Sequence, residues 1–250
     1  MIQNFLDSLD IPQKCFLNKT LFKKLFLESG MLDITDKKAL KDDIDKIRWL
    51  YTLKPSTINI ESVKNDTYEY DEVAILQIDL NNITRANRIA SFVNKAIPYP
   101  LVIIFTHGDI VALNVADKRI NQTDKAKWVV EDSWMTPWFN PNAPSQNEQQ
   151  FMADIVIKGL SFLNFYAFYS DIKSRVIALN SAQRNGTYKI TAKTDTDTRL
   201  KNLRRIENLE KEISELRVSL KKEPQFNMKL TLNVALKECQ DTITQLEQKL

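Results

Sequence analysis

Glycine and histidine are scarce in this chain of 250 residues, which has four glycines and one histidine. Phosphate-binding loops need glycines that let backbone N–H groups approach the ligand, and neither G-x-G-x-x-G nor G-x-x-x-x-G-K-[ST] occurs. Triad or Cys-His catalysis would have to use His107, which lies in a predicted turn with Gly108 and Asp109, where polar residues are common. The sequence therefore predicts no catalytic residue and no cofactor.

Cysteine is also scarce, and Cys15 and Cys239 lie near opposite ends of the chain. They form neither a disulfide framework nor a zinc-ligand motif, which is typical of the reducing cytoplasm. The N-terminus lacks a basic segment followed by an apolar one, so we predict no signal peptide. The most apolar window, residues 155–169, contains Lys158 and is too short and polar to span a membrane. We expect a cytoplasmic protein without a bound metal.

Charge is nearly balanced, with 35 Lys and Arg residues against 32 Asp and Glu residues, and hydrophobic residues make up 43% of the chain. These proportions are ordinary for a globular protein. The net charge of +3 neither requires nor excludes a polyanionic partner, because the distribution of charge matters more than its total.

The pattern of residues 1–140 predicts an α+β domain with N-terminal helices. Amphipathic spacing indicates helices at residues 20–26, 35–50 and 84–97, the last of which ends at Pro98. Runs of β-branched and apolar residues indicate strands at residues 73–80, 101–105, 110–115 and 127–134. We expect a small mixed sheet that helices cover on one face.

Two helical regions are predicted after a linker that contains Pro137, Pro141 and Pro144. The first covers residues 146–192, with helices at 146–169 and 171–183. The second is an antiparallel coiled-coil hairpin over residues 195–250, which turns at Pro224 because proline removes a backbone donor. Apolar residues at alternating spacings of three and four form a narrow seam on each helix of the hairpin. The seam residues are Ile206, Leu209, Ile213, Leu216 and Leu220, then Leu236, Cys239, Ile243, Leu246 and Leu250.

Each seam must be covered by another helix. The two seams can close on each other or on the body of the same chain. A seam on both helices also suits a four-helix homodimer or a partner's coiled coil. We predict that Ile206, Leu209, Ile213, Leu216, Leu220, Leu236, Ile243 and Leu246 drive homo-oligomerisation or the docking of a partner.

Basic residues gather after the third predicted strand and on the helix expected beside the same sheet. They are Arg85, Arg88, Lys118, Arg119, Lys125 and Lys127. With Trp128 and Trp134 they predict a surface for nucleic acid, because cations neutralise phosphates and aromatic rings stack on bases. Asp117 and Asp124 lie among them, so a solvated rim of mixed charge is the alternative.

Metal-dependent nuclease chemistry needs only carboxylates and a lysine. Glu69, Asp71 and Glu72 precede the first predicted strand, and Asp79 lies near its end. The next predicted strand, residues 101–105, lacks the acidic residue and lysine that this chemistry requires. A divergent nuclease that uses Asp71, Glu72 and Asp79 therefore stays an alternative hypothesis.

Several stretches resemble a bacterial and archaeal family that is described only as a domain of unknown function. The resemblance covers nearly the whole chain. Its matching stretches are residues 43–55, 57–60, 96–101, 116–121 and 222–227, with Leu232 and Asn233. A histidine often precedes the Lys-Arg pair in that family, whereas this chain has Asp117, which argues against a catalytic or metal-binding role at this position.

Members of that family tend to be encoded beside helicases and DNA methyltransferases in loci that resemble restriction or antiphage systems. The resemblance implies a non-enzymatic accessory subunit of a DNA-directed defence complex. Its expected partners are a helicase-type protein, DNA as a further candidate, and a second copy of the chain. A purely structural homodimer that does not contact nucleic acid is the other alternative.

Overall fold

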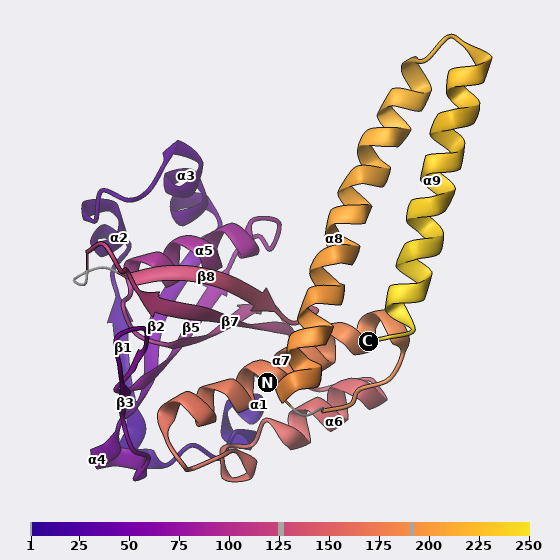
Figure 1. Ribbon diagram of the computed structural model, residues 1–250. Helices are drawn as coiled ribbons and strands as arrows, with labels where there is room; N and C mark the ends of the chain where they lie inside the picture. The colour runs from indigo at the N-terminus through magenta and orange to yellow at the C-terminus, as the bar shows by residue number, and fades with distance from the viewer. Residues whose placement is uncertain (1, 125–127, 191–192) are drawn as a thin grey trace. The chain divides into compact units, whose positions relative to one another are not determined.

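The structure is a computed structural model that describes residues 2–124, 128–190 and 193–250 (Figure 1). The chain forms two compact units, Met1–Leu179 and Asn180–Leu250. The boundary between them falls inside helix α7, Phe165–Asn185. The first unit contains both sheets and the second is helical, which confirms the predicted α+β class.

A six-stranded mixed sheet organises the first unit, in the order β1-β2-β5-β6-β7-β8. Its strands are β1 (Phe16–Leu21), β2 (Ile44–Leu53), β5 (Val73–Leu80), β6 (Leu101–His107), β7 (Ile110–Ile120) and β8 (Trp128–Met135). Only β5 and β6 pair in parallel among these neighbours, and helix α5 (Ala86–Ala96) connects them. The four strands expected from the sequence are therefore confirmed, and β6 and β7 are longer than predicted.

The N-terminal region differs from the prediction of two helices. Helices α2 (Lys23–Glu28) and α3 (Ile34–Asp42) form, but strand β1 precedes α2 and strand β2 replaces the expected end of α3. Residues of β2 pair with β5 from Ile44 to Leu53. This pairing satisfies backbone groups that the helix would have satisfied internally, and β-branched and aromatic residues suit a pleated surface.

Four further helices and strands lie before β5 in the first unit, besides a 3-10 turn at Gln13–Cys15. They are α1 (Ile2–Ser8), α4 (Pro55–Ile58), β3 (Val63–Lys64) and β4 (Glu69–Tyr70), and the last two pair as a short hairpin.

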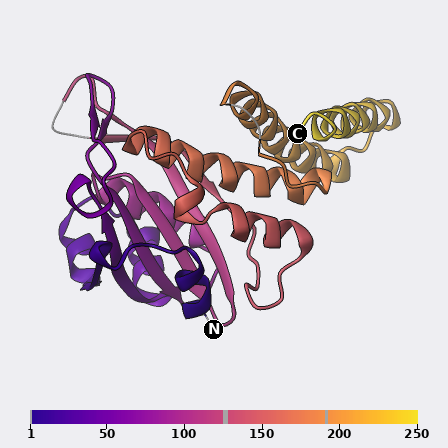
Figure 2. The ribbon, with the colours of Figure 1, turned by 90° about the horizontal axis from the view of Figure 1, so that it is seen from below.

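Both faces of the sheet are buried, whereas the sequence predicted helices on one face. Leu101 and Ile103 of β6 belong to a core that includes residues of α3 and α5. Val102 and Ile104, which point to the opposite face of the same strand, are buried as well. Helix α6 (Gln146–Asp154) and the first part of α7 lie on that side (Figures 1 and 2). Each buried aliphatic side chain contributes roughly 1.5–3 kcal/mol, so both faces stabilise the sheet.

The helix predicted over residues 146–169 is interrupted between α6 and α7. A 3-10 turn at Ile157–Gly159 occupies part of the gap. Arg175 Nε donates to the carbonyl oxygen of Asp154 at 2.7 Å, and the backbone N–H of Ser161 donates to Asp171 at 2.8 Å. These contacts satisfy a carbonyl at the end of α6 and an N–H of the connecting segment, which an apolar pattern by itself does not reveal.

The second unit contains the predicted helical hairpin. Helix α8 (Lys193–Lys222) and helix α9 (Phe226–Glu247) pack together on either side of the turn with Pro224. No helix among the described residues has both the length and the apolar content needed to cross a membrane.

Candidate interaction surfaces

Arg85, the first of the predicted phosphate contacts, forms a two-pronged ion pair with Asp43. Its Nε and Nη2 atoms lie 2.5 and 2.7 Å from the two carboxylate oxygens. The Asp43 side chain is 3% exposed. The paired fork geometry orders the guanidinium and joins the start of α5 to the end of α3. The hydrogen bonds that Arg85 donates to Asp43 raise the pKa of Arg85.

Arg88 also binds carboxylates of α3. Its Nε atom lies 2.7 Å from Asp36, and its Nη2 atom donates to Asp33. Asp33 caps α3 by accepting the backbone N–H of Asp36, and this bond, together with Arg88, lowers the pKa of Asp33. Arg88 thus secures the N-terminus of α3 against α5.

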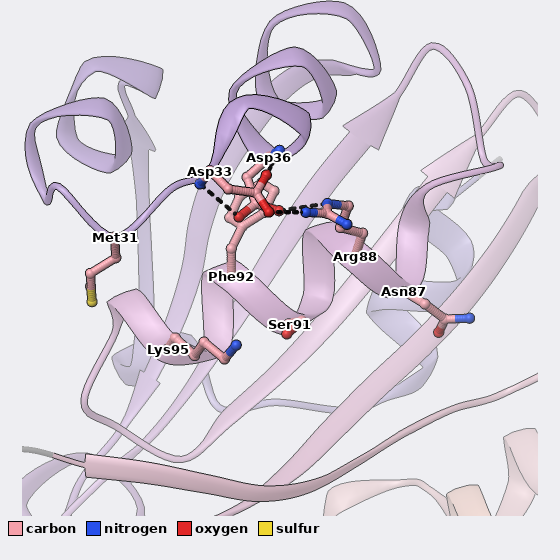
Figure 3. Close-up of a pocket in the computed structure, with 8 residues that line it drawn as sticks. All are labelled: Met31, Asp33, Asp36, Asn87, Arg88, Ser91, Phe92 and Lys95. Carbon is pink, nitrogen blue, oxygen red and sulfur yellow. Dashed lines mark hydrogen bonds and ion pairs between the residues drawn. The ribbon is translucent and has the colours of Figure 1, made fainter.

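A shallow hollow of about 440 Å³ lies beside this ion pair (Figure 3). Figure 3 shows the guanidinium of Arg88 directed at the two carboxylates, while Asn87, Ser91 and Lys95 follow along α5. Met31 from the segment between α2 and α3 forms part of the lining. The Arg88 pair that borders the hollow already has a structural role.

Lys118 is not a surface cation, and its prediction as a phosphate contact is wrong. The residue is 1% exposed, and its Nζ atom donates to the carbonyl oxygens of Ile97 and Tyr99 at 2.8 and 2.6 Å. These carbonyls follow α5, where the helix end carries partial negative charge. Burial lowers the pKa of Lys118 well below its usual range. Alternation along β7 places Lys118 on the same side as Ala116 and Ile120, and this signal was present in the sequence.

The other predicted cations give less support to a phosphate surface. Arg119 Nε lies 2.5 Å from Glu131 Oε1 on the neighbouring strand, so its charge is compensated. Lys125 and Lys127 lie outside the described residues. The alternative of a mixed-charge rim is therefore favoured at Arg85, Arg88 and Arg119.

Asp117, which precedes Lys118 and Arg119 in the sequence, forms an ion pair with Lys173. Lys173 Nζ lies 2.8 and 3.0 Å from its two carboxylate oxygens and 5.3 Å from the centre of the Trp134 ring. Burial raises the pKa of Asp117, and Lys173 opposes that shift. The position connects β7 to α7.

The carboxylates of the nuclease alternative are separately engaged. Asp79 Oδ1 accepts from Gln77 and from Thr106, each at 2.5 Å. Glu69 pairs with Lys64 at 2.7 Å. Burial raises the pKa values of Asp71 and Glu72. No group of three His, Cys, Asp or Glu side chains that could hold a metal ion occurs in the part of the chain that the structure describes.

Three of the stretches that carry the family resemblance meet in the structure. Tyr99 packs edge-on against Trp49 with ring centres 6.1 Å apart, and Lys118 binds the carbonyl oxygen of Tyr99. Tyr169 Oη donates to the carbonyl oxygen of Leu101 at 2.7 Å and accepts from the backbone N–H of Ala116 at 2.9 Å. Residues of these three stretches therefore contact one another, directly or through Tyr169, in the first unit.

The predicted seam residues of the hairpin face one another within the chain. Leu209 and Ile213 of α8 form a buried cluster with Leu236 and Cys239 of α9. Four further seam residues pack against this cluster and are partly buried, namely Leu216, Leu220, Ile243 and Leu246. Ile206 is also buried. The alternative in which the two seams close on each other describes this arrangement, and whether the chain also self-associates stays a prediction.

Sequence reasoning missed two groups of exposed apolar side chains. In the hairpin they are Val218, Phe226, Met228, Leu230 and Val234, which are 48–78% exposed. In the first unit they are Phe22, Leu25, Leu27, Met31 and Ile34. The i, i+4, i+8 spacing of Phe226, Leu230 and Val234 could have revealed these three residues as a second stripe on α9.

The comparisons with known proteins give one family. The model of the family described as "Domain of unknown function (DUF4391)" matches residues 9–243. No curated protein and no solved structure matches the chain.

Proposed function

We propose that this chain, which belongs to the family described as a domain of unknown function (DUF4391), is a non-enzymatic accessory subunit of a DNA-directed defence complex. Its role in the cytoplasm is to bind a helicase-type partner through the C-terminal hairpin. One observation supports the hairpin as the docking element. Its inner seam is closed by its own two helices, whereas Phe226, Leu230 and Val234 remain exposed. Exposed apolar groups of this kind mark interaction sites.

The proposal assigns DNA contact to the partner and not to the predicted basic surface. Arg85, Arg88 and Arg119 are paired with carboxylates, and Lys118 is buried. An ion-paired guanidinium has less charge to offer a phosphate, so its contribution to counterion release is reduced. A partner that carries the DNA-binding function would supply the missing contact.

Coexpression with the proteins encoded beside the gene, and with a helicase-type protein where one is among them, tests this proposal. We expect the full chain to elute with one of them as a stoichiometric complex, with its mass measured by light scattering. The chain by itself should have the monomer mass of 29.0 kDa, because the seam is occupied within one chain. A dimer that binds no protein encoded nearby would instead favour the purely structural homodimer.

A further inference from the structure

The start of α9 presents an apolar stripe on the side opposite the seam. Phe226, Leu230 and Val234 are 78%, 58% and 51% exposed, and their spacing of four places them on one face. Leu230 and Cys239 are nine positions apart, about two and a half turns, so they point to opposite sides of the helix. Cys239 is buried in the seam. The stripe is therefore additional to the contact between α8 and α9.

The same end of the hairpin is basic. Residues 216–237 contain five cations, Arg217, Lys221, Lys222, Lys229 and Lys237, but only one carboxylate, Glu223. The rest of the hairpin, residues 193–215 and 238–250, contains seven cations and nine carboxylates. Among the residues that the structure describes, these five cations make no ion pair within 4.0 Å. Lys237 follows Leu230 by seven positions and so extends the face of the stripe.

These two properties select the chemistry of the partner. An amphipathic helix with apolar residues at spacings of three and four can cover the stripe, as helices do in hydrophobic grooves. Acidic residues on the flanks of that helix would meet Lys229 and Lys237. A second copy of the tip would instead oppose cations with cations, which is unfavourable.

Two other anionic partners fit less well. A phosphate backbone can pair with the lysines but gains nothing from Phe226, Leu230 and Val234. A membrane surface would contact a narrow stripe bordered by the polar residues Asn227, Thr231 and Asn233, whereas interfacial helices bury a broad apolar face. We infer that the outward stripe of α9 docks an acidic amphipathic helix of a partner protein, an inference that rests on the proposed role of the hairpin in assembly.

The test uses the full chain and two short fluorescent helical peptides. Both peptides carry leucines at spacings of three and four, with glutamates at the other positions in one and glutamines in the other. Fluorescence anisotropy should show that the chain binds the glutamate peptide. Its affinity for the glutamine peptide should be at least about tenfold weaker. The double variant Phe226→Ser/Leu230→Ser should lose about tenfold or more in affinity, because it removes the apolar contact.

The control is Ile34→Ser, which removes an apolar side chain of the first unit that is 88% exposed. It should leave peptide affinity unchanged. Circular dichroism of each variant establishes that its helices are retained. Added salt should lower the affinity for the glutamate peptide more than the affinity for the glutamine peptide.

Four results would overturn the inference: no binding at millimolar glutamate peptide, equal binding of both peptides, an unchanged affinity in the double variant, or equal loss in the control. Binding of phosphatidylserine vesicles, duplex DNA or a second copy that depends on Phe226 and Leu230, without peptide binding, would also overturn it. If the double variant still copurifies with the helicase-type partner, the stripe is not the site but the proposed function stands. If the chain binds the peptide but none of the proteins encoded nearby, the proposed function fails, whereas the inference that the stripe docks an acidic helix stands.

Discussion

The first unit, Met1–Leu179, which we call the sheet unit, and the helical hairpin use the same residue types in different ways. In the sheet unit, Arg85 and Arg119 are paired with carboxylates from other elements, and both faces of the sheet are buried. In the hairpin, the seam is buried but Phe226 and Leu230 face solvent near cations that lack such partners. A cation or a leucine therefore indicates an interaction surface only where the fold has left it uncovered.

The largest expected effect comes from placing a charge in the hairpin seam. Ile213→Asp should lower the free energy of unfolding of the hairpin by at least about 3 kcal/mol, because a carboxylate would be buried in an apolar cluster. Urea titration followed by far-ultraviolet circular dichroism measures the loss of helix.

Ser214→Asp is the matched control, since Ser214 is the exposed neighbour of Ile213. It should change stability by less than about 0.5 kcal/mol. Equal destabilisation by the two substitutions would show that the seam is not the packed side of α8.

The next effect concerns the buried amine in the sheet unit. Lys118→Ala should cost about 3 kcal/mol, because it removes the packed side-chain stem and leaves two carbonyl oxygens without their donor. Lys118→Met keeps the stem and should cost less. All four tryptophans lie in the sheet unit, so tryptophan fluorescence in urea measures this change. No loss in either variant would contradict a structural role for Lys118.

The depressed pKa of Lys118 also predicts the direction of a pH effect. The unfolded chain binds this proton up to a pH near the usual value of about 10.4, whereas burial disfavours it in the folded chain. Between the folded and unfolded pKa values, stability should therefore rise with pH in the native protein relative to Lys118→Met. Parallel stability curves for the two proteins from neutral to moderately alkaline pH would contradict this assignment.

The smallest effect is expected at Arg119. Because Glu131 already compensates its charge, Arg119→Ala should leave affinity for a DNA duplex and its salt dependence nearly unchanged. Glu131→Gln would leave the guanidinium without its carboxylate. The affinity for a DNA duplex should then fall more steeply with salt concentration, by the slope that corresponds to about one phosphate contact. Anisotropy titrations over a range of salt measure both slopes. A shallower slope in Arg119→Ala would restore the predicted nucleic-acid surface at this position.

Continuous apolar runs and regular spacing were the most informative parts of the sequence. The strand at residues 101–105 and the seam around Ile213 were predictable, because burial imposes a period on the side chains that face the core. Strand β2 was missed because an amphipathic segment with Ile44, Ile47 and Leu50 fits a helical period as well as a half-buried strand. Its pairing with β5 decides between them.

The sequence by itself determined that the chain is an α+β protein with a heptad hairpin, because these features depend on local periodicity. Only the tertiary structure decided which charged residues face solvent. Arg85 and Asp43 are 42 positions apart, and Lys173 and Asp117 are 56 positions apart. The buried amine of Lys118 likewise donates to carbonyl oxygens of another segment, those of Ile97 and Tyr99. Charge compensation depends on distances in space, and residues this far apart in the chain are brought together only by folding.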